Sequence, residues 1–161
     1  MTLSAKHRIG TARVTLRRAA LAEIITLRYE VLRAGLPPES AAFDGDEEPA
    51  TRHFGAFLDD TGENVGCLSL MERPFEGHPA YQLRGMAARA DVARRGIGTA
   101  LLRFARQEFG PALLWCNARR EAVPFYQRLG WTIASAEFDI PTAGPHYRMA
   151  APVAPLGSAR G

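Results

Sequence analysis

Cysteines and long apolar runs are scarce in this chain of 161 residues. The two cysteines, Cys67 and Cys116, each lie in a short apolar run where a strand is expected, which favours buried reduced thiols over a disulfide framework. No stretch approaches the roughly 18 apolar residues that a membrane-spanning helix needs, and no apolar segment follows the basic N-terminus MTLSAKHRIG. We therefore expect neither a disulfide scaffold nor a membrane span, and a cytoplasmic location.

A large excess of one charge sign is also missing. Lys and Arg number 20 and Asp and Glu number 17, so the net charge is only +3. The basic residues are spread along the chain, and no nucleic-acid partner is expected. Hydrophobic residues make up 47% and charged residues 23%, which is typical of a soluble globular chain. We expect one domain over residues 1–150 and a disordered tail over 151–161.

The first half of the chain changes between the periods of strands and helices. Residues 12–16 alternate apolar and polar side chains, as a half-buried strand does. Apolar residues then recur at three- and four-residue spacing over 21–32, which predicts an amphipathic helix. Residues 36–52 carry prolines and acidic side chains and predict a loop with room for one short helix. Apolar runs at 53–58 and 65–71 enclose a turn sequence and predict a hairpin.

The second half is organised around a glycine turn at Gly96 and Gly98. The run at 112–116 is apolar without alternation, as in a central strand that is covered on both faces. The expected order is strand, helix, strand, helix, strand, strand, at 80–87, 97–109, 112–116, 120–129, 131–140 and 146–151. Both halves together predict an α/β fold.

The most specific local signal is the sequence RRGIGTALL at 94–102, which leaves a strand and opens an amphipathic helix. The first N–H groups of a helix lack internal partners, and glycine admits an anion without a Cβ in the way. The turn lacks the Gly-Lys-Ser/Thr ending of a P-loop and the third glycine of GxGxxG. It predicts a pyrophosphate cradle formed by Arg94, Arg95, Gly96, Ile97, Gly98 and Thr99.

At this turn the chain resembles the GNAT superfamily of N-acetyltransferases. The family signature Gln/Arg-x-x-Gly-x-Gly/Ala is matched at both glycines of 93–98, with Ala93 at its first position. The resemblance extends over residues 12–150, because the expected element order is the family's order. The pattern AxxxYxxxGF is similar to the segment from Ala122 to Trp131, where Trp131 replaces the Phe.

A narrower resemblance is to small bacterial ElaA-like members of the family. It rests on the runs WCNAR at 115–119 and GPHYRM at 144–149. The family resemblance implies a mixed, mostly antiparallel sheet of about six to seven strands, flanked by helices and splayed between the fourth and fifth expected strands. It also implies acetyl-coenzyme A as the acetyl donor, an amine as the acceptor, and no metal.

The resemblance assigns roles to individual residues. The backbone of the fourth strand at Met86, Ala87 and Ala88 is implied to bind the pantetheine and to donate to the thioester oxygen. Asn117 is a further suggested pantetheine contact. Tyr126 is implied to protonate the leaving thiolate, since its ordinary pKa near 10 keeps it protonated at neutral pH.

The proton acceptor for the amine stays open among Glu48, His53 and His146. Each also has a structural interpretation: a charge in a solvated loop, a ring at a strand edge, and a side chain that fixes a turn. The acidic loop Asp44–Glu48 either attracts a cationic acceptor or is plain solvated surface. We leave the oligomeric state open, a homodimer included.

Two functions are compatible with these residues. The first is an acetyl-CoA-dependent N-acetyltransferase that acetylates a primary amine of a small molecule or peptide by direct attack. The second is a non-catalytic acyl-CoA binding or regulatory module, in which Tyr126 only packs beside Phe125.

Overall fold

The computed structural model describes residues 3–151. They form two compact units, residues 3–71 with 84–109 and residues 72–83 with 110–151. The single domain expected over 1–150 therefore stays a prediction. The expected disordered tail lies outside the described residues, apart from Ala151, which ends the last strand. Within residues 3–151 no helix is long and apolar enough to cross a membrane.

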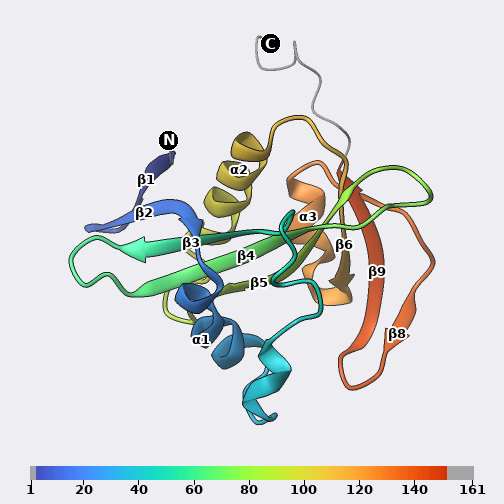
Figure 1. Ribbon diagram of the computed structural model, residues 1–161, viewed down its shortest axis with the longest axis horizontal. Coiled ribbons are helices and arrows are strands. Elements are labelled where there is room, and N and C mark those ends of the chain that lie inside the picture. Colours follow the sequence, from blue (N-terminus) through green and yellow to red (C-terminus); the bar gives the residue numbers. More distant parts are fainter. Residues whose placement is uncertain (1–2, 152–161) are drawn as a thin grey trace. The chain divides into compact units, whose positions relative to one another are not determined.

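The first unit is built on an antiparallel meander (Figure 1). Strands pair with their neighbours in chain order in β1 (Ser4–Ile9), β2 (Ala12–Ala19), β3 (Arg52–Leu58) and β4 (Asn64–Glu72). β5 (Tyr81–Ala88) follows β4 in the sheet and belongs to this unit from Arg84 onward. The predicted hairpin of β3 and β4 is confirmed.

The sequence did not predict β1. Its sequence SAKHRI has one buried residue, Ile9, and the other five are exposed or half-buried. It pairs with β2 over six residue pairs, from Ser4↔Arg17 to Ile9↔Ala12. An edge strand held by backbone bonds needs no apolar alternation, so periodicity did not reveal it.

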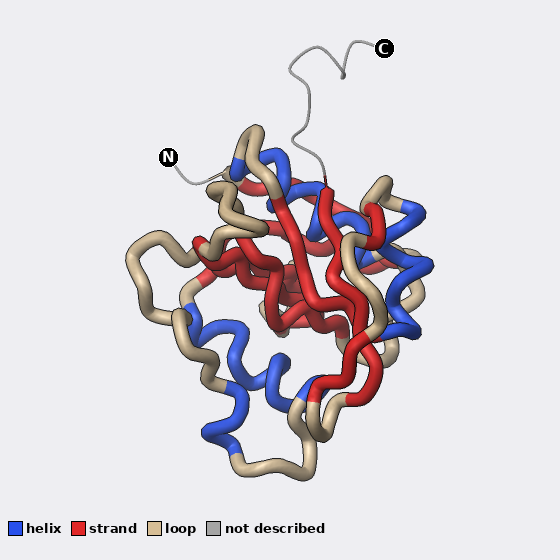
Figure 2. Tube along the Cα trace, turned by 90° about the vertical axis from the view of Figure 1, so that its right-hand side faces the viewer, coloured by secondary structure: helices blue, strands red, loops and turns tan. Residues whose placement is uncertain are grey.

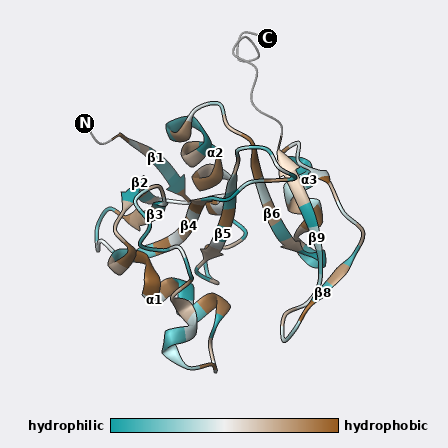
Figure 3. Ribbon diagram, turned by 45° about the vertical axis from the view of Figure 1, so that its right-hand side comes forward, coloured by the Kyte–Doolittle hydropathy of each residue, from teal (hydrophilic) through white to brown (hydrophobic). Residues whose placement is uncertain are grey.

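Two helices pack on opposite faces of this meander. Ile24 and Leu27 of α1 (Leu21–Leu32) share a buried cluster with Cys67 of β4. On the other face, a Cβ on Gly66 would lie 3.0 Å from Ile97 of α2 (Ile97–Phe109), so α2 packs close to the backbone of β4 here. Figure 3 shows hydrophobic and hydrophilic residues alternating along α2, as in an amphipathic helix. Both helices begin and end close to where periodicity placed them.

The segment between α1 and β3 is the predicted loop. Figure 2 shows it as turns interrupted by one short helical stretch, which is the 3-10 helix η1 (Pro38–Ala41). It returns to the face of the meander that α1 covers, because Asp46 of this loop is buried and bonded to Arg28 of α1.

The second unit is a smaller sheet around β9 (Gly144–Ala151). β6 (Leu114–Arg119), β7 (Thr132–Ile133) and β8 (Phe138–Ile140) all pair antiparallel with β9. β6 also pairs in parallel with the start of β5, through Tyr81↔Leu114 and Gln82↔Trp115. The mixed, mostly antiparallel α/β sheet flanked by helices is thus confirmed, with nine strands in place of six to seven.

Two expected elements of the second unit are divided. The strand expected over 131–140 splits into β7 and β8 because the Ser135 hydroxyl accepts the Arg148 N–H at 2.8 Å, where a strand carbonyl would otherwise pair. The helix expected over 120–129 opens as the 3-10 helix η2 (Arg120–Ala122) and continues as α3 (Val123–Arg128). Pro124 has no N–H to donate, which allows an α-helix to start there but not to run through it.

Candidate active site

The glycine turn forms the N-terminus of α2 in the first unit. Gly96 has φ +83°, a left-handed conformation that favours glycine. The first α-helical bond of α2 runs from the Ala100 N–H to the Gly96 carbonyl at 2.9 Å. The N–H groups of residues 97–99 precede that bond and have no hydrogen-bond partner among residues 3–151. Three unpaired amides at the positive end of a helix dipole fit a pyrophosphate.

His7 of β1 borders this turn and was missed by the sequence analysis. A Cβ on Gly96 would lie 3.8 Å from His7 Nε2. That nitrogen is buried and has no hydrogen-bond partner in the described part of the chain. A ring nitrogen left unpaired beside an amide cradle can donate to a phosphate oxygen. No sequence signal pointed to it, because β1 itself was not predicted.

The backbone of β5 bends at Gly85, directly before Met86, Ala87 and Ala88. Gly85 has φ +62°, and its carbonyl accepts a hydrogen bond from the Cys67 thiol at 3.5 Å. A Cβ on Gly85 would lie 2.7 Å from Arg28 Nε, well inside van der Waals contact. The path of the implied pantetheine-binding strand therefore depends on the absence of a side chain here.

Gly85→Ala is expected to lower the free energy of unfolding by about 2–4 kcal/mol, because left-handed backbone strain and the clash with Arg28 add together. Gly62→Ala is the matched control, since Gly62 has φ +78° but nothing within 4 Å of its added Cβ. Denaturant unfolding of both variants separates the clash from the strain. Equal losses would show that Arg28 does not restrict this position.

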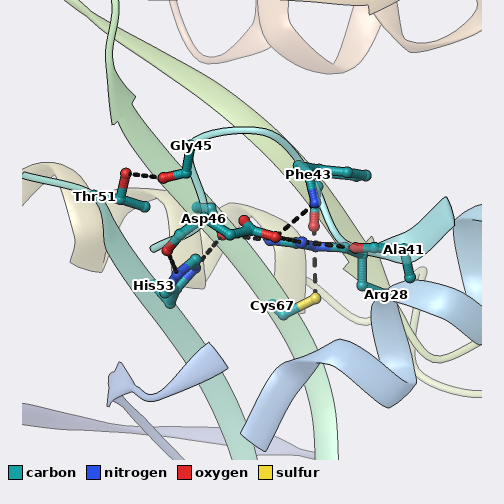
Figure 4. A network of polar contacts seen from close by, with 10 residues as sticks. Arg28, Ala41, Phe43, Gly45, Asp46, Thr51, His53 and Cys67 are labelled. Carbon is teal, nitrogen blue, oxygen red and sulfur yellow. Dashed lines mark hydrogen bonds and ion pairs between the residues drawn. The ribbon is translucent and has the colours of Figure 1, made fainter. Parts of the chain in front are cut away.

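Arg28 is the centre of a buried polar network on α1 (Figure 4). Its Nη1 and Nη2 donate to the two Asp46 carboxylate oxygens at 2.7 and 3.1 Å, and the exposed fractions of the two side chains are 0% and 4%. Nη1 also donates to the Ala41 carbonyl at 2.9 Å, and Nη2 to Ser69 Oγ at 2.9 Å. One guanidinium thus joins α1, β4 and the α1–β3 loop.

His53 completes this network with both of its ring nitrogens. Its Nε2 lies 2.9 Å from the Asp46 carbonyl, which can only accept, so Nε2 carries the proton. Its Nδ1 lies 2.6 Å from Ser69 Oγ, which also accepts from Arg28. Hydrogen bonds therefore link Arg28, Ser69, His53 and Asp46 in one network.

The network changes how the acidic loop is interpreted. Asp46, one of its four carboxylates, is directed into the unit and neutralised by Arg28, so it is not part of a solvated acidic surface. Glu48 is exposed on the same loop. The guanidinium groups of three arginines lie near the Phe43 ring. The Cζ atoms of Arg28, Arg33 and Arg84 are 4.1, 5.1 and 4.6 Å from its ring centre. Arginines rather than carboxylates thus surround the aromatic ring of this loop.

Tyr126 lies on α3 in the second unit. Its ring contacts Phe125 and Trp131, each with 5.1 Å between ring centres. Burial, together with a hydrogen bond to the Cys116 thiol, raises the pKa of Tyr126 well above 10. Burial raises the pKa of the Cys116 thiol to about 12, so this neighbour is also neutral. Tyr126 is therefore a protonated donor across the ordinary pH range.

Asn117 and His146 lie on the face of the second sheet that α3 does not cover. The Cys116 side chain contacts Tyr126 of α3, and successive strand residues point to opposite faces. Asn117 therefore points away from α3. The register pairs Arg119 with His146, which places His146 on the same face as Asn117. His146 Nδ1 donates to the Gly144 carbonyl at 2.7 Å, so Nε2 is the basic nitrogen of the neutral ring.

The predicted site residues therefore fall into two groups. The first unit contains the cradle residues 94–99, Met86–Ala88, Glu48 and His53, and the second contains Asn117, Tyr126 and His146. The sequence analysis missed Arg28, although an arginine beside Leu27 and four residues after Ile24 on the apolar face of a helix is a signal that could have revealed it. The assigned roles stay predictions.

Comparison with known proteins identifies the family. The model of the acetyltransferase (GNAT) domain matches residues 49–133. The uncharacterized N-acetyltransferase YitI of Bacillus subtilis is 32% identical over 127 residues, which cover 76% of this chain and 85% of that protein.

Solved structures share the fold at low sequence identity. The crystal structure of Escherichia coli ElaA has a TM-score of 0.66 at 16% identity and covers 81% of this chain and 88% of that chain. An aminoglycoside 6'-N-acetyltransferase complexed with coenzyme A has a TM-score of 0.64 at 17% identity, over 83% of this chain and 91% of that chain. The predicted resemblance is thus confirmed: the chain belongs to the GNAT family and is an N-acetyltransferase that uses acetyl-CoA.

Proposed function

We propose that this enzyme acetylates a primary amine by direct attack on the thioester of acetyl-CoA, with the pyrophosphate bound at the N-terminus of α2. The observation that carries the proposal is the row of unpaired N–H groups over residues 97–99. Gly96 and Gly98 leave room for the phosphates, while Arg94, Arg95 and His7 supply further donors.

The acetyl group is proposed to lie along β5. The backbone of Met86, Ala87 and Ala88 is suited to bind the pantetheine and to stabilise the oxyanion that forms when the amine attacks, through the N–H groups that face away from β4, since the Ala87 N–H is bonded to Cys67. The left-handed Gly85 redirects the strand directly before them. Arg28 Nε lies so close to Gly85 that a side chain has no room at this position.

Proton transfer is assigned to the second unit. Tyr126 is proposed to protonate the departing thiolate, since its raised pKa keeps the hydroxyl protonated. His146 is the preferred base for the amine, because Nδ1 is held by the Gly144 carbonyl and Nε2 has no hydrogen-bond partner among the described residues. Both ring nitrogens of His53 are occupied in the Arg28 network, which favours a structural role for that histidine.

Gly98→Glu is expected to abolish acetyl-CoA binding, because a carboxylate at the cradle repels the pyrophosphate and fills its place. Gly98→Gln has the same shape without the charge and is expected to weaken binding less. Titration calorimetry with acetyl-CoA measures both, with circular dichroism as the check on folding. Undiminished binding by a folded Gly98→Glu protein would contradict the cradle assignment.

A further inference from the structure

Two polar side chains face each other on the side of the second sheet that is not covered by α3. Asn117 of β6 and Arg148 of β9 are direct partners in the antiparallel register, so their Cβ atoms lie about 4.5–5.5 Å apart on one face. Asn117 Oδ1 and Arg148 Nε are both shielded from solvent, and neither has a hydrogen-bond partner in the described part of the chain. An acceptor and a donor thus stand side by side without bonding to each other.

The neighbouring residues hold this pair in place. The guanidinium of Arg148 lies 5.5 Å from the centre of the Trp115 ring, and the Trp115 indole N–H donates to the Arg73 carbonyl at 3.0 Å. The Arg148 backbone N–H is held by Ser135. Native proteins rarely leave buried donors and acceptors unpaired, so a donor and an acceptor left open together point to a ligand.

We propose that Arg148 and Asn117 bind the acceptor, and that the acceptor is an amine bearing a carboxylate, in its simplest form an α-amino acid. Nε–H and one terminal N–H of an arginine form a fork that matches the two oxygens of a carboxylate. The Asn117 carbonyl oxygen accepts an N–H from the amino group next to that carboxylate. This inference rests on the proposed function, because it names the acceptor for that reaction.

The position of His146 agrees with this acceptor. His146 lies two residues before Arg148 on the same face of β9, about 7 Å along the strand. An amine held next to a carboxylate at Arg148 is therefore within reach of a nitrogen two strand positions away. The amine loses its proton to His146 Nε2 and forms the new N–C bond, while the C–S bond breaks and coenzyme A leaves as the thiolate.

This acceptor differs from the cationic one that the acidic loop suggested. Asp46 is already paired with Arg28, and the aromatic ring of the loop is surrounded by arginines. A diamine without a carboxylate would leave Arg148 Nε unpaired. A carboxylate satisfies it and matches the charge of the site.

The test uses matched pairs of acceptors. A panel of L-amino acids and their decarboxylated amines is assayed by thiol release, and binding of each compound is measured by calorimetry without acetyl-CoA. At least one amino acid is expected to be preferred to its decarboxylated amine by at least about 100-fold in kcat/KM. Arg148→Met is expected to reduce that preference to less than about 5-fold with little change for the amine, and Arg148→Lys, which keeps the charge without the fork, to restore only part of it. Arg128→Met, an exposed arginine on α3, is the control.

Three outcomes would overturn the inference. Equal kcat/KM for amino acids and decarboxylated amines would mean that the enzyme does not recognise the carboxylate. The proposed acetyl transfer would still stand. If calorimetry shows that Arg148→Met binds amino acids as tightly as the wild-type protein does, Arg148 is not part of the acceptor site. If the protein binds acetyl-CoA but no amino acid, the unpaired atoms of Asn117 and Arg148 bind water or pantetheine instead of an acceptor. If amino acids bind through Arg148 but no amine is acetylated, the acceptor site stands and the proposed direct attack fails.

Discussion

Replacing Arg28 with methionine is expected to lower the free energy of unfolding by about 3–5 kcal/mol, because the Asp46 carboxylate would stay buried without a counter-charge. The exposed fractions of the two side chains, 0% and 4%, leave no solvent to replace the lost bonds. Ser69 and the Ala41 carbonyl would lose their donor as well. Denaturant unfolding followed by circular dichroism measures the change.

The double variant Arg28→Met with Asp46→Leu tests whether the loss of stability comes from the buried, uncompensated charge of Asp46. Removing both charges leaves an apolar contact of similar size, and most of the lost stability should return. Arg120→Met is the control, since its contact with Glu137 at 3.5 Å is exposed and should contribute much less. A double variant as unstable as Arg28→Met alone would mean that the ion pair is not the source of the loss.

Tyr126→Phe is expected to reduce kcat by about 10² to 10⁴, with the KM for acetyl-CoA unchanged, because the departing thiolate loses its proton donor. The ring contacts with Phe125 and Trp131 remain, so the free energy of unfolding should fall by only about 1 kcal/mol. Since burial holds the pKa of Tyr126 well above 10, wild-type kcat should show no alkaline loss from this group below about pH 10. Single-turnover kinetics check that chemistry limits the rate.

Cys116→Ala provides the matched control for Tyr126→Phe. It removes the thiol that the hydroxyl contacts and keeps the hydroxyl itself. If Tyr126 is the acid, Cys116→Ala retains most of kcat whereas Tyr126→Phe does not. Similar small losses in both variants would mean that the hydroxyl serves only to satisfy the buried thiol.

The elements that the sequence predicted well are those with an internal pattern. The apolar spacing of α1 and α2 follows from burial of one helix face, and the continuous apolar runs of β3 and β4 follow from burial of both strand faces. β1 depends on backbone pairing with the adjacent β2, and the break between β7 and β8 depends on a hydrogen bond from Arg148 to Ser135. Neither leaves an apolar period in the sequence. The glycine turn at the start of α2, which is the proposed pyrophosphate cradle, was predictable because a glycine turn and a helix start are both local.

By itself the sequence determined the family, the glycine turn that is the candidate cradle, and Tyr126 as the candidate acid, because each is written in contiguous residues whose spacing carries the chemistry. Only the tertiary structure decided which polar groups are already satisfied. It showed that His53 and Asp46 belong to the Arg28 network, while Asn117 and Arg148 face each other with unpaired atoms. The physical reason is that hydrogen-bond satisfaction is a property of neighbours in space, and strand register, not sequence distance, brings residues 117 and 148 together.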